Sequence, residues 1–337
     1  MKMLRRLVSL AILLTMVVIA LGAYTRLTDA GLGCPDWPGC YGMLQIPKQH
    51  HAEQAAALYP QRPLEPHKAR NEMVHRYFAG ALGLWVAAIF FYSWYLYRKP
   101  QLLPLALLLL VTFQAALGMW TVTLNLQPVI VMGHLLGGFS LLTLLWWYRQ
   151  QLSPPAAISA PASAGLRHLG TLAIIILVLQ ISLGGWTSAN YAAVSCVELP
   201  ICHSGWQQQL DFAEAFDLHL GHDNYEFGVM SKEARQTVHI SHRFGAVFAT
   251  LVLLAFCWRL WQQAALRGYA LLIAGLLVLQ VSLGIINVVA LLPLLNAVAH
   301  NFVAVHLLIA TVLARRQLSQ GAFVVPQALY QAGRRFA

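Results

Sequence analysis

Four histidines stand inside or at the edge of long apolar stretches of the sequence: His75, His134, His242 and His300. An ionisable side chain in such a stretch is costly, which makes it a candidate for function. A lone histidine is more often explained by a hydrogen bond between helices, but two corresponding pairs favour a site. Two imidazoles on facing helices supply the axial ligands of a haem iron, whereas zinc needs three or four ligands at one point. We therefore expect one haem between His75 and His134 and another between His242 and His300.

Charged residues accompany the first histidine of each pair. Arg76 and Arg243 follow directly, and a guanidinium there either clamps a haem propionate in a bidentate fork or extends to the membrane surface. Glu72 precedes His75 by three residues, which places both on one helix face, and the matching position in the second pair is His239. A carboxylate beside only one pair predicts that the two sites do different jobs. The alternative for Glu72 is an acid favoured by the dipole at a helix start.

Two cysteine pairs share one spacing, CPDWPGC at 34–40 and CVELPIC at 196–202, and Cys257 stands alone. Each pair is a disulfide, a metal clip or a redox-active thiol pair, and the compartment that the pair faces decides between these.

The bulk composition says which elements must position these residues. Of the 337 residues, 58% are hydrophobic and 10% are charged, whereas about a quarter of the residues of soluble domains are charged. Apolar runs of roughly 20 residues cross a bilayer as helices. Eight such runs are present, near 5–24, 73–97, 102–124, 128–148, 168–189, 238–258, 268–291 and 294–314. The sequence predicts an all-α polytopic membrane protein with eight transmembrane helices.

The charge distribution predicts the orientation of these helices. The net charge is +10. The termini and the short loops on their side carry 13 of the 22 Lys and Arg residues, whereas all twelve Asp and Glu residues lie in the opposite compartment or at its boundary. By the positive-inside rule, both termini are cytoplasmic. The basic excess therefore reflects the orientation of the helices in the membrane, and we expect no nucleic-acid partner.

An internal duplication relates the two halves of the chain. ALGAYT at 20–25 matches SLGGWT at 182–187, and the same offset of 162 residues superposes the two cysteine pairs. QAALG at 114–118 likewise matches QVSLG at 280–284. We expect two pseudo-symmetric four-helix bundles, and because the first apolar run has an internal counterpart we expect it to be retained rather than cleaved as a signal peptide. The expected parts are an N-terminal unit at 1–150 with an outer loop at 25–71, a cytoplasmic linker at 151–166, a C-terminal unit at 167–316 with an outer loop at 190–237, and a cytoplasmic tail at 317–337.

These motifs together resemble those of the haem A synthase family. The resemblance covers about residues 20–314 and rests on GAYTRLTDAGLGCPDWPGCYG at 22–42, Glu72 with His75 and Arg76, His134, His242 with Arg243, and His300. It implies an oxidoreductase that converts the C8 methyl group of haem O to the formyl group of haem A for cytochrome c oxidase.

The resemblance also implies roles for single residues. His242 and His300 would hold a permanent haem b in the C-terminal unit, while His75 and His134 would hold the substrate haem O in the N-terminal unit. Glu72 would act beside the substrate, and the cysteines would form the disulfides Cys34–Cys40 and Cys196–Cys202. The predicted topology agrees, because it places both pairs outside the cytoplasm, where disulfides persist.

The implied location is the inner membrane of a bacterial cell, with both haem sites toward the periplasmic leaflet. The implied partners are haem O synthase as the source of substrate, the cytochrome c oxidase assembly machinery, an electron acceptor of unspecified identity, the lipid bilayer and further copies of the chain in a homo-oligomer.

Two other functions stay open on the residues alone. One is a two-haem b-type membrane cytochrome linked to quinol, although such proteins commonly place ligands near both membrane faces. The other is a haem transporter or chaperone, which would also carry pairs of histidines.

Overall fold

The computed structural model describes residues 1–153, 163–202 and 204–320 and is helical throughout its regular elements. Eight helices in this part are long and apolar enough to cross a membrane, which confirms the predicted fold class. They are α1 (Lys2–Leu27), α3 (Pro66–Tyr97), α4 (Leu102–Thr123), α5 (Pro128–Gln151), α6 (Ala164–Ala189), α8 (Lys232–Trp261), α9 (Arg267–Val289) and α10 (Leu294–Gln320). Two short helices, α2 (Ala52–Leu58) and α7 (Phe212–Ala215), lie in the long connections.

Two of the long helices begin well before their apolar runs, because capping residues rather than hydrophobicity determine the start. The Ser231 hydroxyl accepts a hydrogen bond from the Ala234 amide at 3.1 Å and so caps α8. Helix α3 starts with Pro66, whose missing amide hydrogen costs nothing in the first turn. The polar first turns that result project past the apolar segments and carry the residues that precede His75 and His242.

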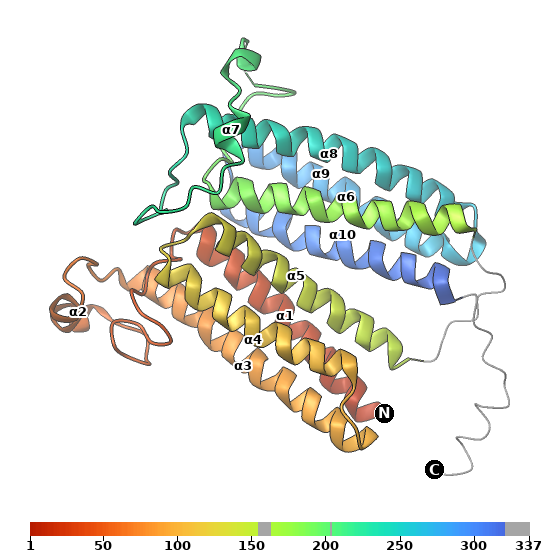
Figure 1. Cartoon of the computed structure of the whole chain (residues 1–337), viewed down its shortest axis with the longest axis horizontal. Coiled ribbons are helices and arrows are strands. Elements are labelled where there is room, and N and C mark those ends of the chain that lie inside the picture. Colours follow the sequence, from red (N-terminus) through yellow and green to blue (C-terminus); the bar gives the residue numbers. More distant parts are fainter. Residues whose placement is uncertain (154–162, 203, 321–337) are drawn as a thin grey trace.

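The eight long helices pack as two groups of four (Figure 1). Helices α1, α3, α4 and α5 contact one another around one group, and α6, α8, α9 and α10 do so around the other. Helices α1 and α5 lie against α10, and α5 also lies against α6, so these four form the seam between the groups. The unit boundaries stay a prediction, and most of the expected linker and tail lies outside the described residues.

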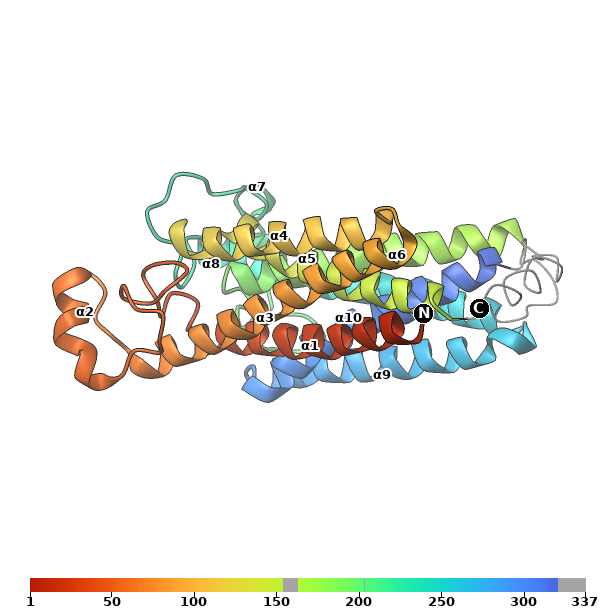
Figure 2. The ribbon, with the colours of Figure 1, turned by 90° about the horizontal axis from the view of Figure 1, so that it is seen from below.

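Both long connections lie at the same end of the helices, which we call the loop end and define as residues 28–65 and 190–231 (Figures 1 and 2). The chain begins at the opposite end, where α1 starts. The loop end is cross-linked between the two groups, because Arg62 forms an ion pair with Glu226 at 3.3 Å and the Asn125 amide donates to the Asp223 carbonyl at 2.8 Å. Arg26 on α1 also donates to the Ser188 carbonyl on α6 at 2.6 Å.

Candidate haem-binding sites

The first predicted histidine pair is brought together between α3 and α5. The ring centres of His75 and His134 lie 6.5 Å apart, with an angle of 84° between the ring planes. A metal ion about 2 Å from one nitrogen of each ring separates the ring centres by about 6 Å. The two imidazoles therefore stand at the separation that one shared iron atom requires, and the residues of this pair fit a haem held by two axial ligands.

The second pair consists of His242 on α8 and His300 on α10, both in the second group of helices. Each ring has a glutamine beside it. The Gln180 amide nitrogen lies 3.0 Å from His242 Nδ1 and donates to the His242 carbonyl at 2.9 Å. The Gln280 amide nitrogen lies 3.2 Å from His300 Nε2. Side chains that orient a metal-ligating histidine are a usual part of such sites, so this pair also fits an axially ligated haem.

The donor set supports haem over a metal ion bound by protein alone. The described residues form no group of three or more His, Cys, Asp or Glu side chains placed to share an ion. The histidines instead come in twos, which suits a macrocycle that supplies the remaining ligands itself.

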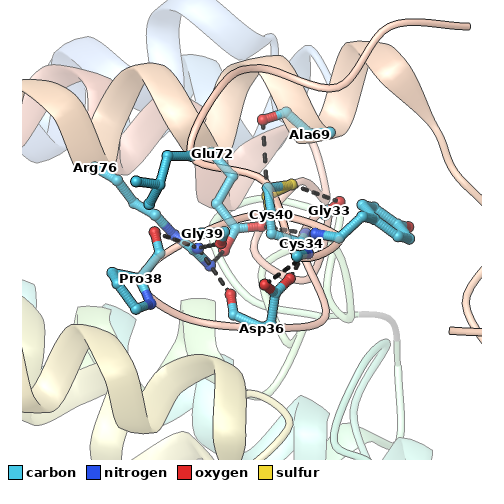
Figure 3. Close-up of a disulfide and its surroundings, with 12 residues drawn as sticks. Gly33, Cys34, Asp36, Pro38, Gly39, Cys40, Ala69, Glu72 and Arg76 are labelled. Atoms are coloured by element: carbon cyan, nitrogen blue, oxygen red, sulfur yellow. Dashed lines mark hydrogen bonds and ion pairs between the residues drawn. A yellow bond between two sulfur atoms is a disulfide. The ribbon is translucent and has the colours of Figure 1, made fainter. Parts of the chain in front are cut away.

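Glu72 and Arg76 lie one turn apart on α3 and hold the first cysteine loop (Figure 3). Glu72 is 4% exposed; its Oε2 accepts the Cys34 amide hydrogen at 2.8 Å, and its Oε1 pairs with the Arg76 guanidinium at 2.5 Å. Arg76 also donates to the Asp36 carbonyl at 2.8 Å and to the Gly39 carbonyl. In this structure both side chains thus fasten the loop at 34–40 to the helix that carries His75. The propionate clamp expected of Arg76 stays a prediction.

The second half repeats this arrangement with one change. Arg243 on α8 donates to the Glu198 carbonyl at 2.7 Å and to the Cys196 carbonyl, and so fastens the second cysteine loop. The carboxylate is missing, however, because His239 occupies the position of Glu72. His239 is buried, and its Nδ1 has no hydrogen-bond partner among the described residues.

Both predicted disulfides are present, Cys34–Cys40 and Cys196–Cys202, and Cys257 is a buried free cysteine. The first loop is packed as well as cross-linked. Burial raises the pKa of Tyr41, whose hydroxyl donates to the Pro63 carbonyl at 3.1 Å. Asp36 accepts the Tyr41 amide hydrogen at 2.6 Å, which closes the loop on itself.

Sequence reasoning missed the glutamines as site residues. Gln114 and Gln280 served only to show the duplication, and Gln180 was not singled out. The signal that identifies them is their constant place four residues before a glycine, in QAALG, QISLG and QVSLG.

Comparison with known proteins gives the family. A family model described as COX15-CtaA, cytochrome oxidase assembly protein, matches residues 5–312. The chain is 48% identical over 309 residues to a heme A synthase of Shewanella oneidensis, covering 91% of this chain and 94% of that protein. Heme A synthases of Methylobacterium radiotolerans (28% identity, 91% and 88% covered) and Sphingopyxis alaskensis (25% identity, 91% and 90% covered) are more distant relatives. The histidine pairs, the disulfide loops and a match across nearly the whole chain agree, and the chain belongs to the COX15-CtaA family of cytochrome oxidase assembly proteins.

Proposed function

We propose that this protein is a haem A synthase, an oxidoreductase that converts the C8 methyl group of haem O to the formyl group of haem A. Its family and its relative at 48% identity support the activity. The observation that carries the proposal within the structure is the facing pair His75 and His134, spaced for one iron atom, beside the buried carboxylate of Glu72. Only one of the two histidine pairs has such a carboxylate, which is what a protein with one substrate site and one resident haem needs.

The two pairs take different roles in this proposal. His242 and His300 hold a resident haem b in a C-terminal unit at 167–316, with Arg243 beside it. His75 and His134 hold the substrate haem O in an N-terminal unit at 1–150, with Arg76 beside it. When bound, a haem would supply one-electron redox chemistry. Turning the methyl group into a formyl group adds one oxygen atom and removes two hydrogen atoms, so the reaction also takes an oxygen donor, water or dioxygen, and an unidentified electron acceptor.

Glu72 is the catalytic residue that we assign from this chain. It lies one turn from His75 on the same helix and would serve as a proton acceptor for the bound substrate; its burial, 4% exposed, marks it as a functional candidate because a buried charge is costly. A proton taken up at Oε1 breaks the ion pair with Arg76, which then rests on the loop carbonyls alone. Proton uptake at Glu72 is in this way coupled to the hold of α3 on the loop at 34–40.

The setting follows from the charge distribution and the family. We place the chain in the inner membrane of a bacterial cell with both termini cytoplasmic and with the loop end, the disulfides and the haem sites toward the periplasm. Haem O synthase supplies the substrate, and the cytochrome c oxidase assembly machinery receives the product.

The test is to express the full chain in cells that supply haem O and to identify the extracted haems. Haem A should form with the wild-type chain and with His306→Ala, since the His306 ring packs against Phe302 and belongs to neither pair. It should not form with His75→Ala or Glu72→Ala. Unaltered haem O in every culture, with the protein present in the membrane, would overturn the proposal in favour of a cytochrome or a transporter.

A further inference from the structure

Each of the four histidines lies against a glycine of the helix that precedes it in the same helical pair. Gly22 on α1 faces His75, Gly118 on α4 faces His134, Gly184 on α6 faces His242 and Gly284 on α9 faces His300. A Cβ atom at these four glycines would lie 3.0, 3.5, 3.0 and 3.2 Å from the Cε1 atoms of the respective rings. At Gly22, Gly184 and Gly284 the missing side chain therefore gives the imidazole the room to lie against the neighbouring backbone, whereas a Cβ atom at Gly118 would make an ordinary contact.

The same short pattern surrounds all four glycines: VIALG at 18–22, QAALG at 114–118, QISLG at 180–184 and QVSLG at 280–284. The four helix pairs that contain them, α1 with α3, α4 with α5, α6 with α8 and α9 with α10, are each in direct contact. The chain thus repeats one kind of helix pair four times. In each pair the first helix carries a glycine near its C-terminal end, and a histidine of the second helix lies against that glycine.

The residue four positions before the glycine lies beside the histidine ring in every pair. Its backbone carbonyl approaches the ring at Val18, Gln114 and Gln280, although Nδ1 of these three histidines makes no hydrogen bond of normal geometry to a described residue. At Gln180 the side-chain amide itself reaches Nδ1 of His242. Three of the four positions thus carry an amide side chain, and Val18 is the exception. The Gln280 amide nitrogen lies 3.2 Å from Nε2 of His300 rather than from Nδ1, and the Gln114 amide nitrogen has no hydrogen-bond partner among the described residues.

The packing around the exception differs in a consistent way. Gln114 and Gln180 lie against Gly137 and Gly245, each three residues after its histidine, where a Cβ atom would collide with the amide. The residue three positions after His75 is Phe78. Beside His75 a valine and a phenylalanine therefore stand where His134 and His242 have a glutamine and a glycine, whereas His300 has Gln280 with Val303. No polar side chain can orient His75 from the position of Val18.

We propose that Gln180 is a positioning residue that would keep His242 firmly on the iron of a resident haem, and that Val18, at the corresponding position of the first half, leaves His75 as the ligand that a substrate haem would lose during turnover. This inference rests on the proposed function, because it takes the four histidines as haem ligands. A polar partner on the second ring nitrogen fixes the tautomer and the orientation of a ligating histidine, and losing it typically weakens metal binding about 10- to 100-fold. A resident haem needs firm ligands, whereas a substrate haem has to enter and leave, so the apolar neighbour belongs at the substrate site.

The test uses carbon monoxide, which binds a reduced haem only where an axial position is free. The full chain is purified with its haems, reduced, and mixed with carbon monoxide, and the binding rate is followed by absorbance. The variants are Val18→Gln, the double variant Val18→Gln with Phe78→Gly, which gives the amide the room that Gly137 and Gly245 give Gln114 and Gln180, and Gln180→Val. The matched controls are Val17→Gln and Leu179→Val, at neighbouring positions that are 43% and 55% exposed on the outside of the helices.

We expect the Val18→Gln double variant to slow carbon monoxide binding about 10-fold and Gln180→Val to create a second reactive haem, with both controls unchanged. Equal rates in wild type and in both Val18→Gln variants, or an unreactive second haem in Gln180→Val, would overturn the inference. A variant with His75→Ala and His134→Ala separates this result from failure of the proposed function. If that variant keeps the full haem content of the wild type, the first pair holds no haem and the proposed function itself is wrong.

Discussion

At the scale of single residues, the chemistry and the structure of the first site share the same side chains. Glu72 is the carboxylate that we assign to catalysis, and in the structure it also receives the Cys34 amide hydrogen and the Arg76 guanidinium. The residue type and its place one turn before His75 were predictable from the sequence. Its partners were not, because Cys34 lies 38 positions away in the chain and nothing local to Glu72 indicates a contact with it.

Substitutions of Glu72 separate the two roles. Glu72→Ala leaves Arg76 buried without its ion partner and should lower the stability of the first unit by about 3 kcal/mol, as loss of one member of a buried pair does. Glu72→Gln keeps an oxygen for the Cys34 amide but loses the ion pair with Arg76, so it should cost less stability than Glu72→Ala while forming no haem A. The measurements are thermal unfolding of the purified protein and haem extraction. Haem A formation by Glu72→Gln at the wild-type rate would remove the proton role and leave a structural one.

Substitution by alanine should weaken haem binding at one helical glycine, Gly184, and leave it unchanged at another, Gly80. A Cβ atom at Gly184 would lie 3.0 Å from His242 Cε1, so Gly184→Ala has to displace the ring and should weaken haem binding in the second pair about 10-fold. Nothing lies within 4 Å of a Cβ atom at Gly80, so Gly80→Ala is the matched control. The readout is haem bound per protein and its absorbance. Equal haem loss in both variants would mean that helix packing, and not contact with the ring, explains the effect.

At the scale of elements, the first cysteine loop is held to α3 by more than its disulfide. Arg76 donates to the loop carbonyls of Asp36 and Gly39, and Glu72 accepts from Cys34. The sequence predicted the disulfide from spacing and resemblance, whereas the docking of the loop depends on side chains of a helix that follows it. Arg243 holds the second cysteine loop in the same way. The arginine that follows the first histidine of each pair, Arg76 or Arg243, thus fastens a cysteine loop in its half of the chain.

The disulfide should therefore contribute less to the hold of the loop than the arginine does. In the chain-entropy estimate, a cross-link that closes so short a loop is worth about 2 kcal/mol. Arg76→Ala removes several hydrogen bonds and leaves Glu72 as an unpaired buried charge, which should cost about 3–5 kcal/mol. Thermal unfolding and limited proteolysis of the loop compare Arg76→Ala with the double variant Cys34→Ser and Cys40→Ser. A loop that is cleaved faster in the cysteine variant than in Arg76→Ala would contradict this ranking.

At the scale of the whole molecule, polar contacts join the two groups of helices at both ends. Arg62 and Asn125 meet the second long connection at the loop end. At the other end Arg316 on α10 donates to the Trp147 carbonyl at 2.8 Å and to Gln150 Oε1 at 3.1 Å, and it lies 4.7 Å from the centre of the Trp147 ring. Its neighbour Arg315 instead bonds to Thr171 and Ser319, within the second group.

These neighbours offer a matched test of the seam. Arg316→Ala should weaken the contact between the groups by about 1–2 kcal/mol, because it removes a cation–π contact and two hydrogen bonds. Arg315→Ala should leave the seam unchanged. Thermal unfolding monitored separately by haem absorbance and by far-ultraviolet circular dichroism measures the effect, and equal shifts in both variants would show that Arg316 has no special part in joining the groups.

The sequence predicted most of the fold and only part of the sites. Long apolar runs determine membrane helices through the bilayer thickness, and the two cysteine pairs lay within one short loop each, so the eight helices and both disulfides were confirmed. The duplication singled out the four histidines, and the structure brings His75 and His134 together, while the role of both pairs as haem ligands stays a prediction. The contacts between glycines and histidine rings, and the seam between the two helix groups, could not be predicted. Each depends on which helices become neighbours, and the apolar pattern of a membrane helix does not say which face meets a partner.

The bonds between Asn125 and the second connection also have a consequence for how the protein is made. Asn125 and Asp223 are separated by 98 positions, so a growing chain presents the first to the membrane long before the ribosome has added the second. At a translation rate of roughly 5–20 residues per second, the delay is about 5 to 20 s. During that interval the newly inserted first group lacks the contacts of Asn125 with Asp223 and of Arg62 with Glu226. These contacts form only after the second long connection has been synthesised.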